Sequence, residues 1–294
     1  MNTLAILLTC FNRKEKTLSA LDSIYKAHGV SERDFSMDIF LTDDGSTDDT
    51  SIAVSTKFPK VNILKGTGNL FWSEGMRNSW KAAIKEKKYD GYLLFNDDTI
   101  LYKNAFNQLF KSHQFSTETL KMSGIYVGAT ENKETKQLTY SGSLITNKFL
   151  YTQKRLSPNG EFQKCDLANA NIMLVSKEVV DKIGILTEGY EHGIADYDYT
   201  LTANKVGIPV LIAPEICGHC INDHNDYYEN FTRKSLKERK KILYNPTGLA
   251  HRSYKKYMLK FFPMRLPFFV FFGWFKLYFP KLYVNYFLKS RRKV

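Results

Sequence analysis

Short apolar runs alternate with longer stretches of helical periodicity throughout the first 113 residues of this 294-residue chain. The expected strands are 4–9, 37–42, 61–64 and 91–95, and the expected helices are 14–27, 49–58, 72–87 and 103–113. Short strands that alternate with helices indicate βα units around a mainly parallel sheet. The sequence therefore predicts an α/β fold of the nucleotide-binding type, with helices that flank a central sheet.

The alternation becomes less regular after residue 122. Strands with Gly and Asn turns are expected over 123–129 and 138–153, further short strands at 172–176 and 208–213, and further helices at 177–183 and 197–206. No linker-like sequence precedes about Asn245. We therefore expect one domain over residues 1–245 and a separate carboxy-terminal helical segment over residues 246–294.

Four of the expected strands are followed directly by polar residues. These segments are 9–12 (TCFN), 43–46 (DDGS), 66–69 (GTGN) and 96–99 (NDDT). In a parallel sheet the carboxyl ends of the strands meet at the edge where ligands bind. Each segment alone is also an ordinary turn or helix-capping sequence. Because all four converge on one edge, they predict a ligand site there.

Asp97 and Asp98 are adjacent carboxylates after an apolar strand. They repel each other unless a cation or hydrogen bonds from a ligand offset the repulsion. Mg²⁺ and Mn²⁺ take one or two carboxylates together with phosphate oxygens, so an ion that bridges to a diphosphate is expected. Asp44 can accept a hydrogen bond from a pyrimidine imide, and Phe11 offers an aromatic surface to the base. Arg77 either reaches a phosphate or lies on a solvated helix face.

Five motifs, in the order of the chain, resemble those of a known family. They are LLTCFNR, FLTDDGSTDDT, GTGNLFWSEGMRN, LLFNDDT and GIADYDYTLTANKVG. Over about residues 3–215 the chain resembles the family 2 glycosyltransferases, which have the GT-A fold. The resemblance implies an inverting enzyme that transfers a sugar from a UDP- or dTDP-sugar, with Mn²⁺ or Mg²⁺ as cofactor.

The resemblance also assigns a donor site. It implies that Asp44 contacts the nucleobase and that Asn96, Asp97 and Asp98 lie at the metal and the diphosphate. Asn96 stands where the family usually has Asp, so Asp98 is the preferred metal ligand and Asp97 is expected to support the sugar or ribose. The other residues expected to bind the donor are Thr9, Phe11, Asn12, Asn69, Trp72 and Arg77.

A second carboxylate cluster, Asp196 and Asp198, lies in the last motif. The family usually has Glu-Asp there, and Ala195 replaces the Glu while Asp196 keeps the Asp position. A sugar hydroxyl is a poor nucleophile, so a carboxylate within hydrogen-bond reach is expected to act as general base. We expect this catalytic role for Asp196, with Asp198 as the second candidate. The alternative is that Asp196 caps the following helix.

Histidines supply the remaining candidates. The resemblance implies that a histidine after the strand 208–213 completes the metal or diphosphate shell, and His219 is better placed for this than His224 behind it. His192 and Asn171 are expected to line the acceptor site. A structural role for His192 is the alternative.

The last 44 residues differ from the rest in charge and composition. The formal net charge is 42 − 30 = +12, and residues 251–294 carry eleven basic and no acidic residues, which leaves +1 for residues 1–250. They also carry 15 of the 42 aromatic residues. An apolar stripe of helical period recurs there, which Pro280 should kink or divide. Its members are Phe268, Phe272, Phe275, Phe279, Leu282 and Tyr286.

The uncharged run between Arg265 and Lys276 is too short to cross a bilayer, which takes about 20 residues. An apolar stripe beside basic residues is instead typical of an interfacial membrane anchor. The alternatives are a helix pair that makes a homo-oligomer and a stripe buried against the body. The aromatic content exceeds what contacts to a nucleic-acid backbone require, so no nucleic-acid partner is expected.

Four cysteines, and an opening too short and too soon charged for a signal peptide, favour a reducing, cytoplasmic compartment. With the tail, this predicts a peripheral protein at the inner face of the cell membrane. We expect a hexosyltransferase that extends a glycolipid or polysaccharide acceptor in bacterial surface-glycan synthesis, such as capsule, O-antigen or cell wall. The alternative, favoured by Asn96 and Ala195, is a catalytically impaired nucleotide-sugar-binding or scaffold protein of a glycan-assembly complex.

Overall fold

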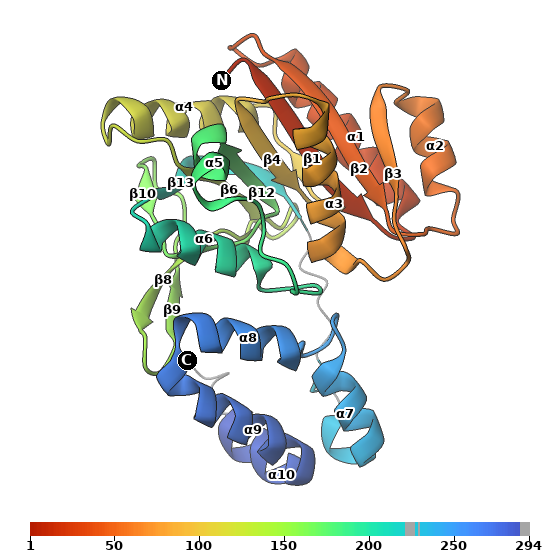
Figure 1. Ribbon diagram of the computed structural model, residues 1–294, viewed down its shortest axis with the longest axis vertical. Coiled ribbons are helices and arrows are strands. Elements are labelled where there is room, and N and C mark those ends of the chain that lie inside the picture. The colour runs from red at the N-terminus through yellow and green to blue at the C-terminus, as the bar shows by residue number, and fades with distance from the viewer. Residues whose placement is uncertain (221–226, 229, 289–294) are drawn as a thin grey trace.

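The computed structural model describes residues 1–220, 227–228 and 230–288 (Figure 1). It confirms the expected alternation of strands and helices in the first part of the chain. The elements there are β1 (Thr3–Cys10), α1 (Lys14–Gly29), β2 (Ser36–Asp43), α2 (Thr50–Lys57), β3 (Val61–Lys65), α3 (Phe71–Glu86), β4 (Gly91–Phe95), β5 (Ile100–Leu101) and α4 (Ala105–Glu118). The two-residue strand β5 has no counterpart in the expected pattern.

The next part is richer in short strands than the sequence predicts. It contains β6 (Ile125–Glu131), β7 (Leu138–Tyr140), β8 (Gly142–Asn147), β9 (Thr152–Arg155), β10 (Gln163–Lys164), β11 (Leu167–Ala168), β12 (Ile172–Ser176), α5 (Lys177–Ile183), α6 (Ala195–Lys205) and β13 (Val210–His219). The range 138–153, expected as strands with Gly and Asn turns, contains β7, β8 and the start of β9, which pairs back onto β8 antiparallel. The strand expected at 208–213 continues to His219 through irregular pairing with β6.

The central sheet has the strand order β10-β13-β6-β12-β4-β1-β2-β3. Strands β1 to β4 run parallel, and β13 runs parallel to β6, whereas β12 lies antiparallel between β4 and β6. This confirms the α/β fold with a mainly parallel sheet. Strands β8, β9 and β11 form a separate antiparallel sheet.

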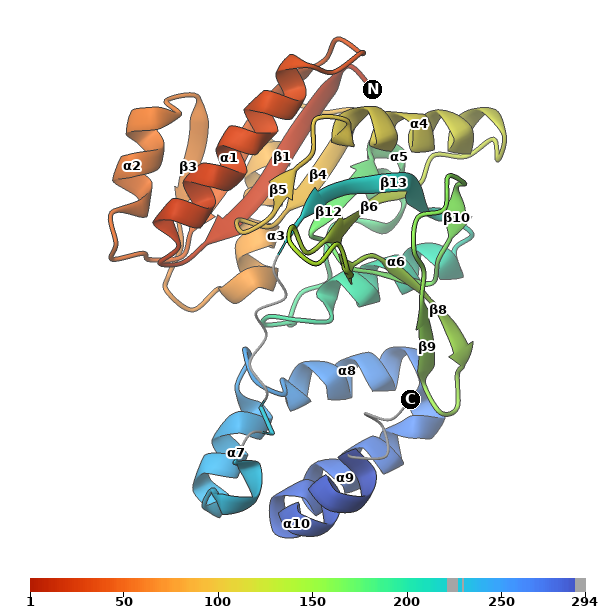
Figure 2. The ribbon, with the colours of Figure 1, turned by 180° about the vertical axis from the view of Figure 1, so that it is seen from behind.

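Two hydrophobic cores lie on the two faces of the central sheet. In β1, Leu4, Ile6 and Leu8 face the core under α1, α2 and α4, while Ala5 and Leu7 face the core under α3, α5 and α6. Parallel strands that are buried on both faces need such continuous apolar runs. Helices therefore cover both faces of the sheet (Figures 1 and 2), and the polar ends of β1, β2 and β4 point toward the carboxy-terminal helices.

Those helices lie below the body in Figure 1. They are α7 (Leu236–Tyr244), α8 (His251–Phe261), α9 (Leu266–Tyr278), α10 (Pro280–Leu282) and a π-helical turn (Tyr283–Leu288). The helix divides before Pro280, as the sequence predicts. Helix α8 shares a hydrophobic cluster with the body, in which Tyr257 and Met258 pack with Tyr190 and Ile194. Among the described residues, no helix is both long and apolar enough to span a membrane.

Candidate active site

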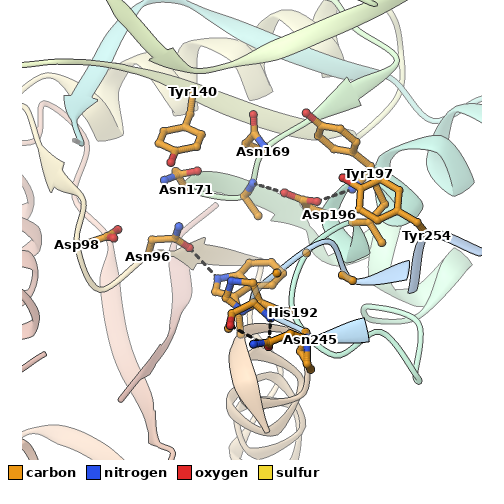
Figure 3. A pocket seen from close by; sticks show the side chains of 18 of the residues that line it. Asn96, Asp98, Tyr140, Asn169, Asn171, His192, Asp196, Tyr197, Asn245 and Tyr254 are labelled. Carbon is orange, nitrogen blue, oxygen red and sulfur yellow. Dashed lines mark hydrogen bonds between the residues drawn. The ribbon is translucent and has the colours of Figure 1, made fainter. Parts of the chain in front are cut away.

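A cavity of about 890 Å³ lies between the carboxyl edge of the sheet and the carboxy-terminal helices. The body contributes Arg13, Trp72 and residues of the segments 96–98, 169–171 and 192–197 to its wall. The opposite wall is made by Ile242, 245–248, Ala250 and Tyr254. Figure 3 shows Asp98 on one side of this cavity and Asp196 on the other. The fold thus brings two distant carboxylate clusters to one space.

Asp97 and Asp98 follow β4 and share one cation, the guanidinium of Arg13. Arg13 Nη1 lies 2.7 Å from Asp98 Oδ2 and 3.3 Å from Asp97 Oδ1. Burial raises the pKa of Asp97 to about 7, and the charge of Asp98 acts in the same direction while Arg13 acts against it. Asp97 Oδ2 is buried and accepts no hydrogen bond from the described part of the chain. This oxygen is therefore placed to meet a cation or a donor group of a ligand.

Three expected site residues do meet beside this pair. Trp72 Nε1 donates a hydrogen bond to Asn96 Oδ1 (2.8 Å), and the backbone N–H of Asn96 donates to the carbonyl of Asn171 (3.2 Å). All three side chains line the cavity. Because the Asn96 amide oxygen already accepts from the indole, the arrangement agrees with Asp98 rather than Asn96 as the preferred metal ligand.

Asp196 lies in the first turn of α6, with its carboxylate in the cavity wall (Figure 3). Its Oδ1 accepts from the backbone N–H of Tyr197 (2.8 Å) and its Oδ2 from that of Ala170 (3.3 Å). Residue Ile194, not Asp196, occupies the N-cap position, so the alternative of a capping role is not met. Burial raises the pKa of Asp196 to about 6, against the effect of these N–H groups. Such a carboxylate is ionised at pH 7 and still basic enough to accept a proton.

Asp198 does not suit the catalytic role. It is fully buried, and its carboxylate accepts hydrogen bonds from Thr187 Oγ1 (2.7 Å), Tyr190 Oη (2.7 Å) and Lys260 Nζ (2.8 and 2.9 Å). These partners occupy both oxygens and keep them from the cavity. Asp198 is therefore a structural anchor that ties α6 to α8, which corrects its expected place as second candidate base.

Arg77 meets neither expectation stated for it. Its side chain is buried, and its guanidinium pairs with Glu74 (3.0 Å) and Glu188 and donates to the carbonyl of Leu186. These contacts hold α3 against the segment 186–188, outside the cavity. A phosphate could reach this guanidinium only if these ion pairs broke.

Asp44 also has a different role from the expected direct contact with a nucleobase. Its carboxylate accepts the backbone N–H groups of Gly68 (2.8 Å), Leu70 (2.8 Å) and Phe71 (3.0 Å). A Cβ at Gly66 would lie 2.6 Å from Asp44 Oδ1, so the loop passes closely over the carboxylate. Asp44 fixes the loop between β3 and α3 and does not line the cavity.

The remaining expected donor residues do not line the cavity: Thr9 lies near the end of β1, and Phe11, Asn12 and Asn69 lie on loops. Thr9 is buried against α3, where a Cβ at Gly75 would lie 2.2 Å from Thr9 Oγ1. Asn12 Oδ1 accepts from the backbone N–H of Thr47 (2.7 Å) and joins the loop after β1 to the loop after β2. Three of these residues are exposed, namely Phe11, Asn12 and Asn69.

The histidines are split between the cavity and its surroundings. His192 lines the cavity, as expected. His219 does not, because its ring lies against Tyr102 with 5.6 Å between the centroids. His224 lies outside the described residues. Within the part of the chain that the structure describes, no three His, Cys, Asp or Glu side chains cluster as a metal site, so His219 does not join Asp98 there.

Asp97 and Asp98 nevertheless fit a divalent cation. Mg²⁺ and Mn²⁺ need only one or two protein carboxylates when phosphate oxygens and water fill the other positions. Asp97 supplies a buried oxygen without a partner among the described residues, and Asp98 supplies a second carboxylate. These two residues would hold the ion, with the rest of its shell supplied by the ligand.

Sequence reasoning missed several residues of the cavity wall. They are Arg13, Tyr140, Asn169, Tyr197, Asn245 and Tyr254. Two signals were present, since Arg13 ends the first motif and Asn169 stands two residues before Asn171. Asn245 and Tyr254 belong to the carboxy-terminal segment, whose return to the sheet edge is a tertiary feature that no local pattern reveals.

The sheet order defines the class of fold, an α/β fold with a mainly parallel central sheet that is shared with glycosyltransferases of known structure. Two of these are similar to this chain over most of its length. TarS 1–349 of S. aureus in complex with UDP has a TM-score of 0.52 and 15% identity, over 83% of this chain and 66% of that one. The mannosyltransferase PcManGT of Pyrobaculum calidifontis, in complex with GDP-Man and Mn²⁺, has a TM-score of 0.51 and 12% identity, over 79% and 60%.

A third solved structure, TarS 1–349 in complex with UDP-GlcNAc, has a TM-score of 0.50 and 13% identity, over 83% of this chain and 67% of that one. No protein-family model matches the sequence, and no curated protein matches it. By the coverages given above, the chain spans about two thirds of the length of these three solved chains. At such low identity, the likeness shows the fold alone.

Proposed function

We propose that the protein is an inverting glycosyltransferase that moves a sugar from a UDP- or dTDP-sugar to a hydroxyl group of an acceptor. The position of Asp196 carries this proposal. It lies in the wall of the cavity that Asp97 and Asp98 also line, on the side away from Asp98 (Figure 3). A base on one side and a diphosphate site on the other suit direct displacement with inversion. The fold shared with proteins bound to GDP-Man, UDP and UDP-GlcNAc supports a nucleotide-sugar donor.

The chain's own residues supply the steps of this reaction. Asp196 accepts the proton of the acceptor hydroxyl while the oxygen of that hydroxyl forms the bond to the anomeric carbon of the donor sugar. The nucleoside diphosphate leaves with the electron pair of the bond that breaks. Asp97 and Asp98 would hold Mn²⁺ or Mg²⁺, which would supply positive charge to the leaving diphosphate. Arg13 lies on the same side and adds a second positive charge.

The cavity wall supports a saccharide acceptor. Tyr140, Tyr197 and Tyr254 offer aromatic surfaces, and Asn169, Asn171 and Asn245 offer amide groups. Aromatic faces and amides suit sugar rings, which present C–H surfaces and hydroxyls together. We extend the proposal to a glycolipid or polysaccharide acceptor of bacterial surface-glycan synthesis, reached by a protein that sits peripherally at the inner face of the membrane.

A catalytically impaired nucleotide-sugar-binding or scaffold protein is the second candidate. It is favoured by Ala195, which is fully buried where the family resemblance implies Glu, and by Asn96, whose amide oxygen is engaged by Trp72. Both candidates bind a donor, but only an enzyme turns it over.

Transfer and hydrolysis with a panel of UDP- and dTDP-sugars, with Mn²⁺ or Mg²⁺, decide between the two. We expect turnover with one of these donor classes, and Asp196→Asn should lose about 10² to 10⁴ in turnover while donor affinity by calorimetry stays near wild type. Asp181→Asn, an exposed aspartate, is the matched control and should retain full activity. Donor binding without turnover on any acceptor would favour the scaffold. Loss of donor binding in Asp196→Asn would move this residue into the donor site.

A further inference from the structure

Exposed apolar side chains are concentrated at the carboxy-terminal end of the molecule. The described residues include 20 large apolar side chains that are exposed, and ten of these lie between residues 259 and 288. Three more lie on β8 and the turn that follows it, namely Leu144, Phe149 and Leu150. Soluble monomers seldom gather exposed apolar surface in this way, so the concentration marks an interaction surface.

The outward face of α9 is apolar. Phe268, Phe271, Trp274 and Tyr278 are 54%, 59%, 57% and 50% exposed, and their spacing of three and four residues places them on one side of the helix. Surface helices usually turn polar residues outward and apolar residues inward. Here the outward face has the character of a buried one.

This outward face differs from the stripe expected from the sequence. Phe272 and Phe275, two members of that stripe, pack against Phe287 with ring centroids 5.1 and 5.8 Å away. Their side chains are partly buried, while Phe271 and Trp274 take the outward positions. Helix α9 is apolar on both sides, so a periodicity count alone could not choose the outward one.

The turn between β8 and β9 continues this face. Phe149 and Leu150 at its tip are each 57% exposed. The Phe149 ring lies 6.1 Å from that of Phe268, and Arg265 Nη1 donates a hydrogen bond to the Phe149 carbonyl (2.8 Å). In both views the β8–β9 hairpin reaches down from the body to the level of α8 and α9 (Figures 1 and 2). Two elements far apart in sequence thus share one apolar surface.

We propose that the outward face of α9 and the hairpin tip at Phe149 and Leu150 form a single membrane-docking surface, and that it binds the headgroup region of an anionic bilayer. We call these residues the docking surface. The inference rests on the proposed function in one respect, namely that docking would give the enzyme access to a lipid-linked acceptor. Docking itself requires neither donor nor sugar transfer.

Charge favours an anionic bilayer over a second copy of the chain. Residues 233–294 contain 17 basic residues and one acidic residue, a net charge of 17 − 1 = +16, which leaves 12 − 16 = −4 for residues 1–232. Lys148, Arg265 and Lys281 belong to or adjoin the docking surface. A two-fold symmetric dimer would press two such basic segments together, whereas anionic headgroups attract them.

The geometry of α9 suits the plane of a bilayer interface. A helix of 13 residues is about 20 Å long, enough to lie along the headgroup layer but not to cross the hydrocarbon core. Trp274 and Tyr278 belong to the residue types that are enriched at the membrane–water boundary.

The docking surface is also tied to the candidate base. The ring of Phe269 on α9 stacks on His251 of α8, with 4.6 Å between the centroids. Lys260 of α8 then pairs with Asp198 in α6, the helix that carries Asp196. A protein docked in this way would hold its cavity at a set height above the headgroups.

Sedimentation of the full chain with vesicles of phosphatidylglycerol and phosphatidylcholine, without donor, tests the inference. Wild type should pellet with these vesicles and less so at high salt. Phe149→Ser with Leu150→Ser should lower the partition coefficient about tenfold, and Phe271→Ser with Trp274→Ser by at least as much. The control is Val30→Ser with Ile52→Ser, two exposed apolar side chains elsewhere, which should bind as wild type. A hairpin variant that binds as wild type would overturn the two-element surface. A wild type that never pellets but sediments as a dimer would assign the surface to a second copy.

A second measurement does not depend on loss of binding. Phe149→Trp in a Trp274→Phe background should show a blue-shifted emission on vesicle addition and quenching by brominated lipid. Ile52→Trp in the same background should show neither. An unquenched Phe149→Trp that still pellets would overturn the hairpin contact. Docking without any sugar transfer would contradict the proposed function alone, and transfer without docking would contradict this inference alone.

Discussion

The two carboxylate pairs, Asp97 with Asp98 and Asp196 with Asp198, are built alike but differ in the cation that holds them. In each pair one carboxylate makes the closer contact with a basic side chain, Asp98 with Arg13 and Asp198 with Lys260, and the other is a buried cavity residue with a raised pKa. Asp97 also lies 3.3 Å from Arg13. The side chain of Arg13, which serves the first pair, is 41% exposed. Lys260 serves the second pair, but its partner Asp198 is fully buried and also holds two hydroxyl groups. Arg13 can therefore give way to a cation that a ligand brings, whereas Lys260 is part of the fold.

The largest expected effect comes from removing the divalent ion that we expect at the first pair, Asp97 and Asp98. Chelation of divalent ions should abolish sugar transfer, and Asp98→Ala should imitate the chelator, because the first pair and a diphosphate repel one another without a counter-charge. Initial rates with Mn²⁺, Mg²⁺ and chelator measure this. Asp198→Asn serves as the contrast, since any activity it retains should show the same metal requirement as wild type. Full activity in chelator would show that the chain's own cations, Arg13 among them, suffice as counter-charge and would refute the metal site.

Substitutions at the second pair should lower the stability of the fold. Lys260→Met leaves the Asp198 carboxylate buried without its cation, which should lower the free energy of unfolding by about 3 kcal/mol. Denaturant unfolding measures the change. Lys255→Met, on an exposed position of the same helix, should stay within about 0.5 kcal/mol of wild type. Equal stability of the two variants would show that α8 is not anchored through Asp198.

The pairs also show how far the sequence could predict the molecule. The strands and the polar segments at their ends were predictable, because a parallel strand buried on both faces must read as an apolar run, as Leu4 to Leu8 do. The position of Asp196 in the cavity wall agrees with its place in the motif. Its neighbour Asp198 has the same local context, and tertiary contacts with Thr187, Tyr190 and Lys260 separate their roles.

Other parts of the site depend on contacts that no local pattern encodes. Arg77 and Asp44 stand in suitable motifs, yet one pairs with Glu188 and the other holds the loop before α3. Helix α8 reads as part of a separate basic tail, although Tyr254 lines the cavity. A truncation from about residue 252 would therefore remove both a wall of the site and the anchor of Asp198, and would not test the tail alone.

The pH dependence of catalysis should belong to the second pair. Asp196 acts as a base only when ionised, and its pKa is raised by burial to about 6. Hence kcat, measured with metal and donor saturating so that Asp97 is held ionised, should be steady above pH 7 and fall about tenfold for each unit of pH below 6. Rates measured from pH 5 to 8, with donor binding followed in parallel, separate this effect from titration of the donor site. A residual activity of Asp196→Asn that kept the same pH profile would place the titrating group elsewhere.

The smallest expected effect is the number of protons released when the metal binds, which should depend on the first pair and not on the second. Burial raises the pKa of Asp97 to about 7, so at pH 7 about half of the molecules carry a proton on this carboxyl. Mn²⁺ with UDP must displace that proton to use the carboxylate, and about half a proton should be released for each ion bound. Calorimetry in buffers of different ionisation enthalpy measures the number. Asp97→Asn should reduce the release toward zero, while Lys260→Met should leave it unchanged because the second pair takes no part.

Arg13→Gln should increase the release, since loss of the guanidinium raises the Asp97 pKa further. Lys26→Gln, at the far end of α1, is the control. An unchanged release in Asp97→Asn would mean that the metal does not bind at this pair.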